Sequence, residues 1–400
     1  MKEINNKKQR ISSNTILLLI INTIRKIIDI FLGPFLTAYL FKVAIDNIKI
    51  ISIYNIFSYV VVAVFALIIG KVIKNKYKME IFRLGMISKF IQLLLIVVLG
   101  DKVVEHIWLL AVMAGFSTEA WSFPLNLFST TLVKENEKET FVVYKSILNN
   151  LCKVLVPFLL GTIIFIKSFT ITAIIILALT FIQIIISLFI EDNMVENKTN
   201  EKLHVIDEFK KIKNDRKLKR FYNMKFFKGL AYEGALETAV TLLIIIAFKS
   251  DFSLGIVTSI TSLLAVLSSW IYKKINNEKK LNSIVIFSSI IILLFSILLV
   301  FLTNNTTIVI YNLVFSFFLQ FIMVLEEVKT LKFTNSNVIT EKNRVETFIL
   351  LEFFLNLGRI IGYLLLLITG LFFNIYLLEV VIIILVFAII LETDNLIKFN

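Results

Sequence analysis

The sequence has almost none of the residues that form disulfides and soft-metal sites. Cys152 is the only cysteine among 400 residues, so an intrachain disulfide and a cysteine metal cluster are both excluded. The two histidines, His106 and His204, lie far apart, and no H-E-x-x-H zinc motif is present. We therefore expect neither a metal nor a cofactor.

The signatures of soluble enzymes are missing as well. The chain has no G-x-x-x-x-G-K-S/T phosphate loop, so it carries no ATPase of its own. It also lacks a G-x-S-x-G motif, the turn that presents a nucleophilic serine in hydrolases. No polar stretch is long enough to form a soluble domain with an active site. We therefore expect that the protein is not an enzyme.

Charged residues are scarce, at 18% of the chain, whereas hydrophobic residues make up 58%. A soluble chain is about half apolar. The charges stand in short clusters between long apolar runs. A helix needs about 20 apolar residues to cross a hydrocarbon core about 30 Å thick, and it satisfies its own backbone hydrogen bonds in lipid. The composition therefore predicts an all-α integral membrane protein in the lipid bilayer.

Twelve apolar runs are long enough to cross the membrane, and we expect each to form one transmembrane helix. Prolines are rare, and all three, Pro34, Pro124 and Pro157, fall within these runs, where a proline loosens or kinks a helix. The runs cover residues 15–41, 53–72, 82–100, 107–132, 141–166, 169–190, 223–248, 253–272, 282–302, 306–326, 346–369 and 372–391.

The longest polar stretch covers residues 191–222 and contains neither proline nor glycine. Apolar residues recur in it at helical spacing from Leu203 to Ile212, which fits either an interfacial amphipathic helix or a solvated linker with some helix. We expect a cytoplasmic linker here. It divides the chain into an N-terminal bundle of six helices, residues 1–190, and a C-terminal bundle of six, residues 223–400.

The positive charge of the chain is distributed unevenly among the loops. The net charge is +13, but the basic residues border apolar segments and form no basic domain, so we expect no nucleic-acid partner. If the N-terminus lies inside, nearly all loop lysines and arginines fall on the cytoplasmic side. An even number of helices returns the C-terminus to that side. We therefore expect a multi-pass protein of the cell membrane with both termini in the cytoplasm.

The two halves of the chain share short sequences at matching places. Glu139-Thr140-Phe141, at the start of the fifth run, recurs as Glu346-Thr347-Phe348 at the start of the eleventh. Further along the same runs, Asn150-Leu151-Cys152-Lys153 aligns with Asn356-Leu357-Gly358-Arg359. The alignment predicts a repeat of six helices, which is a common way of building transporters.

Six helices, a basic cytoplasmic loop and six further helices, with both ends inside, resemble the major facilitator superfamily (MFS) over nearly the whole chain. Gly70 and the lysines after it stand where that family often has a glycine-rich signature, although Lys74 replaces the usual aspartate and Tyr77 the usual glycine. The resemblance implies alternating access by two bundles that rock around a midplane site. It also implies that helices 1, 4, 7 and 10 line the cavity. We expect the protein to function as a monomer.

Several charges fall near the middle of the predicted helices. A charge at the bilayer centre costs a few kcal/mol, so it usually faces a partner or a water-filled cavity. Most of these charges lie on helices that line or flank the cavity in the resembled fold. They are Arg25 and Asp29 in helix 1, Glu119 in helix 4, Lys153 in helix 5, Glu233 and Glu237 in helix 7, and Arg359 in helix 11.

These charges allow two interpretations, of which the first is that they pair and hold helices together. Arg25 and Asp29, one helical turn apart on one face, are the main candidates for such a pair. Three other sites fit the pattern less well. Lys89 lies close enough to the cytoplasmic end of helix 3 to reach it. Glu326 and Glu327 lie at the cytoplasmic end of helix 10 and are expected at the interface, and Glu379 in helix 12 has no predicted role.

The second interpretation is that some carboxylates bind substrate or carry a proton. Glu119, Glu233 and Glu237 are the candidates, because loss of water and a second nearby carboxylate both favour the protonated form. Lys153 and Arg359 would then neutralise the carboxylates or bind an anionic group of the substrate.

The function that these observations favour is secondary active transport of a small solute or amphipathic molecule, driven by protons. One alternative within transport is a flippase for lipids or lipid-linked sugars. An alternative of another class is a membrane-embedded enzyme or a non-transporting membrane partner.

Overall fold

The computed structural model describes residues 12–75, 78–131, 137–190, 203–275, 277–334, 343–372 and 375–399. These residues are almost entirely helical. The elements are α1 (Ser13–Ile30), η1 (Phe31–Phe35), α2 (Leu36–Val43), α3 (Ile48–Asn75), α4 (Lys78–Leu99), η2 (Gly100–Val104), α5 (Ile107–Thr131), α6 (Lys138–Ile166), α7 (Phe169–Leu188), α8 (Val205–Asn214), α9 (Arg216–Leu230), α10 (Ala235–Phe248), α11 (Asp251–Lys273), α12 (Glu278–Phe301), α13 (Asn305–Thr334), α14 (Arg344–Phe372) and α15 (Ile375–Lys398).

The membrane-spanning helices number twelve, as the sequence predicts. Among the described residues, ten helices or joined helices are long and apolar enough to cross a membrane. The first span, α1–η1–α2, is an eleventh, whose α1 part carries three charges, at Arg25, Lys26 and Asp29. The twelfth is α5, which is 25 residues long but contains Glu119 among several polar residues. The protein is therefore an all-α integral membrane protein.

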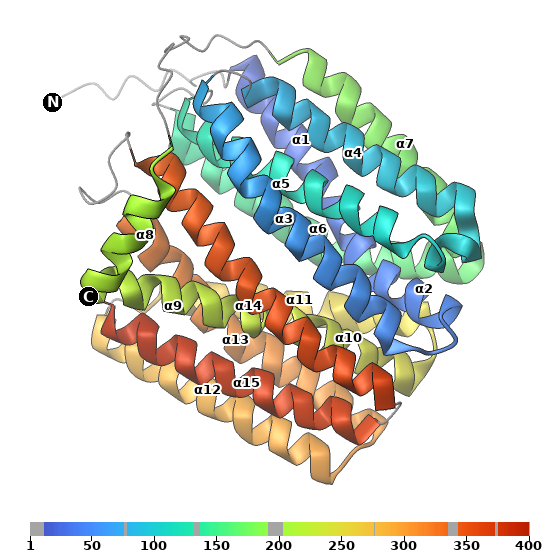
Figure 1. Cartoon of the computed structure of the whole chain (residues 1–400). Helices are drawn as coiled ribbons and strands as arrows, with labels where there is room; N and C mark the ends of the chain where they lie inside the picture. The colour runs from blue at the N-terminus through green and yellow to red at the C-terminus, as the bar shows by residue number, and fades with distance from the viewer. Residues whose placement is uncertain are drawn as a thin grey trace, which may run out of the picture.

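The helices form two bundles that pack side by side. Figure 1 shows α1 to α7 on one side and α9 to α15 on the other, with α14 of the second bundle lying along α3 of the first. The second major contact between the bundles joins α6 to α11. We call these the N-bundle and the C-bundle. The helix pairs α3–α14 and α6–α11 thus form the walls of any space between the bundles.

Both described ends of the chain lie at one end of the molecule, near α8 (Figure 1). The backbone N–H of Ser12 donates to the Glu137 carboxylate (3.2 Å), beside the start of α6. The Arg220 guanidinium donates to the carbonyl of Lys398 (2.6 Å). We call this the α8 end and the opposite one the far end.

Polar side chains mark where several of these helices begin. The Ser168 hydroxyl accepts the N–H of Ile171 (3.2 Å) at the start of α7, and the Asn277 side chain accepts that of Lys279 (2.9 Å) at the start of α12. Asp215 does the same at the start of α9. Such caps satisfy N–H groups that have no partner within the helix.

The first span is not one continuous α-helix, as expected for a span that contains a proline. Its middle, Phe31–Phe35, is a π-helical turn that contains Pro34. Proline has no N–H to donate, and its ring crowds the carbonyl four residues earlier, so a wider turn accommodates it. The prolines of the other two spans lie within α5 and α6.

The seventh and tenth spans differ from the prediction. The seventh begins at Arg216, seven residues earlier than expected, and is interrupted between Leu230 and Ala235. The tenth continues to Thr334, eight residues beyond the expected end. Hydrophobicity reports only whether a residue can lie in lipid, so it reveals neither a break held by polar contacts nor a helix that extends past the bilayer.

The polar stretch between the bundles contains a helix, α8, as the spacing of its apolar residues indicates. Ile206 and Phe209 are exposed and Ile212 is buried. The ring of Phe209 stacks on Phe354 of α14, with 6.2 Å between centroids. The earlier part of the stretch, residues 191–202, lies outside the described residues.

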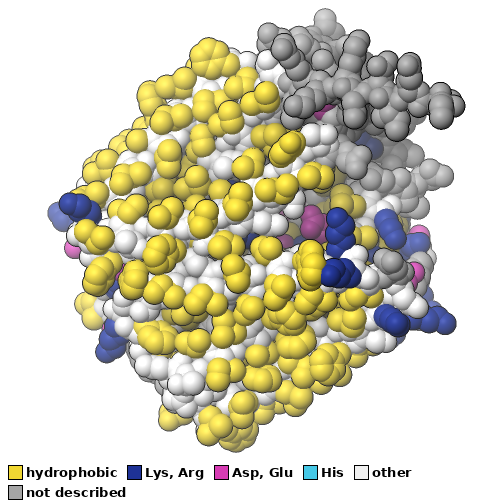
Figure 2. All heavy atoms as spheres, turned by 180° about the vertical axis from the view of Figure 1, so that it is seen from behind, with side chains coloured by type: hydrophobic (Ala, Val, Ile, Leu, Met, Phe, Trp, Pro, Cys, Tyr) yellow, Lys and Arg dark blue, Asp and Glu magenta, His cyan; other side chains and the backbone are white. Residues whose placement is uncertain are grey.

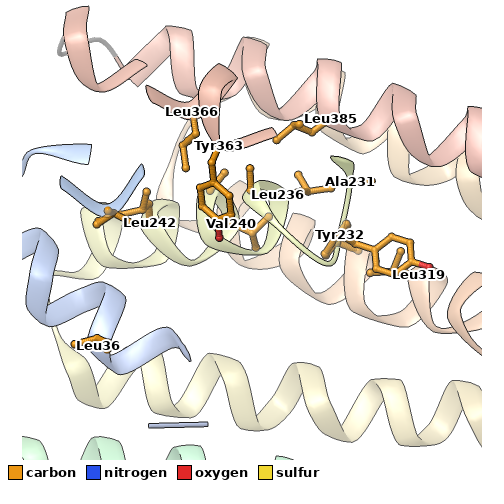
Figure 3. Close-up of a cluster of buried hydrophobic side chains, with 14 of the residues drawn as sticks. Leu36, Ala231, Tyr232, Leu236, Val240, Leu242, Leu319, Tyr363, Leu366 and Leu385 are labelled. Carbon is orange, nitrogen blue, oxygen red and sulfur yellow. The ribbon is translucent and has the colours of Figure 1, made fainter. Parts of the chain in front are cut away.

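The core of the C-bundle forms where α10, α14 and α15 meet. Figure 3 shows Leu236 and Val240 of α10 beside Tyr363 and Leu366 of α14, with Leu385 of α15 nearby. All five side chains are buried. The face of the molecule seen in Figure 2 is also largely apolar, as a surface in contact with lipid must be.

Candidate functional site

Five charged residues form a continuous chain of contacts within the C-bundle, which we call the C-bundle network. Glu233 pairs with Arg359 (Oε2 to Nη2, 2.9 Å) and with Lys228 (Oε1 to Nζ, 2.9 Å). The same Lys228 ammonium pairs with Glu326 (2.8 Å). Glu326 also accepts a hydrogen bond from Lys225. The network therefore ties α9 and the break after it to α13 and α14.

Arg359 also supports the break in the seventh span directly. Its Nε donates to the backbone carbonyl of Glu233 (2.8 Å), and its Nη1 donates to Asn356 (3.0 Å). The Tyr363 hydroxyl donates to the carbonyl of Gly234 (3.3 Å). A backbone group that loses its helical partner within the membrane needs another one. Side chains of α14 supply it here.

Burial of Glu326 contradicts the expectation that it lies at the membrane interface. Its residue is 1% exposed, because α13 continues for eight residues beyond it. Lys89 is likewise buried and does not extend to the surface as expected. Glu379 now has an explanation, since the Thr303 hydroxyl at the end of α12 donates to its carboxylate (2.6 Å).

The charges of α1 form a different arrangement in the N-bundle. Arg25 pairs with Asp29 (3.0 Å), as their spacing of one helical turn predicts. The guanidinium also donates to the Ser117 hydroxyl of α5 (3.2 Å) and lies 5.0 Å from the centroid of the Trp121 ring. Arg25 thus holds α1 against α5, which agrees with the interpretation that the mid-helix charges pair and hold helices together.

Four further charges make no side-chain ion pair or hydrogen bond among the described residues but act on one another, and we call them the central site. They come from four helices and both bundles. The charges of Lys26 and Lys153 act on Glu237, and those of Lys26, Glu237 and Glu327 act on Lys153. Glu237 and Glu327 are exposed, although α10 and α13 are spanning helices. The members are Lys26 in α1, Lys153 in α6, Glu237 in α10 and Glu327 in α13.

Glu119 lies where the two bundles meet. It is 0% exposed, and within the described part of the chain neither carboxylate oxygen has a hydrogen-bond partner. The charges that act on it are those of Glu352 and Arg359, both from α14. The next turn of α5 packs on α14 as well, with the rings of Phe123 and Phe348 6.3 Å apart.

The seven predicted site residues therefore fall into four groups. Arg25 with Asp29, and Glu233 with Arg359, form ion pairs. Glu237 and Lys153 belong to the central site, and Glu119 is buried where α5 meets α14, with no partner among the described residues. Sequence reasoning missed Lys26, Glu327 and Glu352. The first is visible as a charge beside Arg25, whereas the others are close to predicted helix ends, where a charge needs no special explanation.

No group of three or more acidic, cysteine or histidine side chains that could hold a metal occurs within the part of the chain that the structure describes. The arrangement is thus one of opposed charges between two helix bundles, with a buried carboxyl group beside them. Such a site can bind a polar solute and hold a proton.

Comparison with known families identifies the family to which the chain belongs. The Major Facilitator Superfamily model matches residues 15–362. The chain belongs to the Major Facilitator Superfamily. This MFS protein is therefore a multi-pass membrane transporter and not an enzyme. No curated protein matches its sequence.

Solved MFS structures share the fold at low sequence identity. A bacterial homologue of the iron transporter ferroportin, in an inward-facing state, is 12% identical and has a TM-score of 0.71, with 96% of this chain and 97% of that chain covered. A variant of the nucleoside transporter NupG is 14% identical at a TM-score of 0.71, covering 96% and 99%. A variant of the E. coli fucose:proton symporter FucP is 12% identical at 0.60, covering 95% and 96%.

Proposed function

We propose that this MFS protein is a secondary active transporter that moves a small polar solute across the cell membrane in exchange for, or together with, protons. The observation that carries the proposal is the central site. Lys26 and Lys153 of the N-bundle face Glu237 and Glu327 of the C-bundle, and none of the four is ion-paired among the described residues. A solute that binds there contacts both bundles, so its binding is sensitive to their relative movement.

The loop charges support an orientation with the α8 end in the cytoplasm. At the far end the bundles are linked by Lys42 of α2 and Asp251 of α11, whose side chains pair at 2.6 Å. There Gly161 of α6 packs directly on Gly255 of α11. These contacts support an arrangement in which the extracellular end is closed. We infer that alternating access requires them to separate.

Glu119 is the candidate for proton coupling. Its carboxyl group is buried and has no hydrogen-bond donor among the described residues, and the charge of Glu352 on the other bundle acts on it. A carboxylate shielded from water is costly to ionise, and a second negative charge nearby adds to that cost, so we assign a proton to Glu119 while the bundles are packed here. Movement of α5 away from α14 would admit water and release that proton.

Glu233 is a weaker candidate, because Lys228 and Arg359 both neutralise it. Its role in the proposal is to hold the broken span in place. Glu237, which has no such partner among the described residues, is assigned to solute binding.

Uptake into proteoliposomes tests this proposal. A panel of radiolabelled small solutes is offered with and without a gradient of about one pH unit, which supports up to about tenfold accumulation per coupled proton. Wild-type protein is expected to accumulate at least one solute when the gradient is present. Glu119→Gln should abolish the dependence on the gradient while exchange of unlabelled for labelled solute persists. The matched control is Glu105→Gln, at an exposed position at the far end.

Two results would contradict the proposal. Uptake by the wild type that ignores the gradient would exclude proton coupling. A Glu119→Gln protein that still responds fully to the gradient would remove Glu119 from the coupling role.

A further inference from the structure

The two unpaired lysines of the central site lie side by side. The Asn22 side chain of α1 donates to Asn149 of α6 (3.1 Å), and Lys26 and Lys153 each follow one turn later on helices that run in the same direction. One turn advances a helix by about 5.4 Å, so both lysines project at the same level. Each charge acts on the other, and both are partly buried. Two adjacent ammonium groups removed from bulk water are stabilised by an anion between them.

The two unpaired carboxylates of the C-bundle, Glu237 and Glu327, are exposed although they lie on spanning helices. The charges of Lys26 and Lys153 act on Glu237. The charge of Glu327 acts on Lys153 and also on Lys145, two turns nearer the α8 end of α6. Figure 2 shows basic and acidic side chains gathered in one patch of an otherwise apolar face, toward the α8 end. The site is therefore divided by sign, with cations on the N-bundle and anions on the C-bundle.

Several other charges of the spanning helices are already neutralised by the protein, whereas Glu119 is buried and has no partner among the described residues. Arg25 pairs with Asp29, and the C-bundle network satisfies Glu233, Glu326 and their cationic partners. A simple anion would neutralise the two lysines and leave Glu237 and Glu327 unpaired. A simple cation would do the reverse.

We propose that the solute is a zwitterion, with its anionic group between Lys26 and Lys153 and its cationic group at Glu237 and Glu327. This assignment rests on the proposed transport function and names the class of its substrate. The zwitterion joins the oppositely charged walls of the two bundles, so it stabilises the arrangement in which they face each other. Amino acids and short peptides have this chemistry in water, and phosphatidylethanolamine has it in the bilayer.

Thermal unfolding of the purified full chain in detergent tests the proposal with matched probes. The probes are the amino acids and a set of dipeptides, each with an analogue that lacks the ammonium group and an analogue that lacks the carboxylate. For L-phenylalanine these analogues are 3-phenylpropanoate and 2-phenylethylamine. At least one zwitterion is expected to raise Tm, with both of its analogues binding at least about tenfold more weakly, because each lacks one charged contact.

Variants then assign each charge to its partner. Glu237→Gln should remove the discrimination between the zwitterion and its deaminated analogue. Lys153→Gln should remove the discrimination between the zwitterion and its decarboxylated analogue. A loss of structure alone would weaken all three probes equally. Lys167→Gln, an exposed lysine at the end of the same helix, should leave the preference unchanged.

Two outcomes would overturn the zwitterion. One is a deaminated or decarboxylated analogue that binds the wild type as tightly as the parent. The other is a complete panel in which no zwitterion raises Tm. Gradient-driven uptake of a solute with a single charge would leave the proposed function standing without this assignment. Zwitterion binding without any uptake would support the zwitterion assignment and contradict the proposed transport function.

Proteoliposomes distinguish a zwitterionic lipid from a soluble zwitterion as the substrate. Protein-dependent transbilayer movement of labelled phosphatidylethanolamine, compared with that of labelled phosphatidylglycerol, tests whether the lipid is the substrate. Protein-dependent movement of the first lipid alone, with no amino-acid binding, assigns the site to a zwitterionic lipid. Movement of neither lipid, with an amino acid or peptide bound, assigns it to a soluble solute.

Discussion

The two bundles place a basic residue at positions that the sequence repeat aligns, and they use it differently. Arg359 in α14 contacts Glu233 twice and Asn356 once. Lys153 in α6 has no ion pair or hydrogen bond to any described residue, although Glu237 faces it. The same position therefore makes ion-pair and hydrogen-bond contacts in one bundle and has no partner among the described residues in the other.

The difference follows from the helix that each cation meets. The seventh span is broken, so its carbonyls and carboxylates need donors, and Arg359 can donate from several nitrogens at once. The first span accommodates Pro34 with a π-helical turn and needs no such donor from α6. Charges thus tie the helices of the C-bundle together, whereas Lys26 and Lys153 of the N-bundle have no partner among the described residues.

The largest expected effect comes from opening the C-bundle network at its centre. Glu326→Gln leaves Lys225 and Lys228 without their shared carboxylate in a buried place. Breaking a buried pair in this way costs about 3 to 5 kcal/mol. The free energy of unfolding, measured by SDS titration in mixed micelles, should fall by that amount. Glu327→Gln at the next, exposed position should change it by about 0.5 kcal/mol or less. Equal losses in both variants would contradict the network.

The next test compares the two aligned cations. Arg359→Gln should lower the free energy of unfolding by about 2 to 3 kcal/mol, the range for hydrogen bonds to charged groups. Lys153→Gln should leave it unchanged or raise it slightly, because an unpaired charge in the membrane is removed. The same SDS titration measures both. A larger loss for Lys153→Gln would show that the N-bundle depends on its cation for structure.

Substitutions at Gly358 and Cys152, the residues just before Arg359 and Lys153, test how closely α14 and α6 approach their neighbouring helices. A Cβ at Gly358 would lie 2.1 Å from the carbonyl oxygen of Phe226 in α9, so the backbones would have to separate. Gly358→Ala should therefore cost about 1 to 3 kcal/mol, as overpacking does. Cys152→Ala, at the aligned position in α6, should cost about 1 kcal/mol or less. If both substitutions are tolerated in thermal unfolding, the tight contact of α9 with α14 is not needed.

The smallest effect is expected between the bundles. The pair of Lys42 and Asp251 is partly exposed, with side chains 41% and 20% accessible, and such pairs contribute about 1 kcal/mol or less. Lys42→Gln should lower stability by no more than that, and the difference should vanish at about 1 M salt, where screening is strong. A loss as large as that for Glu326→Gln would mean that the bundles are fastened to each other as firmly as the C-bundle is within itself.

Much of the fold and part of the site could be predicted from the sequence. The twelve spans follow from the lengths of the apolar runs, and the Arg25–Asp29 pair follows from spacing on one helix face. The break after Leu230 could not be predicted, because Arg359, whose hydrogen bonds satisfy it, lies more than a hundred residues away. Glu326 was assigned to the interface for the same reason, since its partners Lys225 and Lys228 come from another helix.

The sequence by itself therefore determined that this chain crosses a membrane twelve times, because a run of apolar residues needs only its own backbone to form a stable helix in lipid. It also determined which charges the bilayer would not tolerate alone. Only the tertiary structure decided which of those charges neutralise one another and which have no partner among the described residues. That outcome depends on which helix faces meet, and electrostatic interactions between distant segments leave no local pattern in the chain.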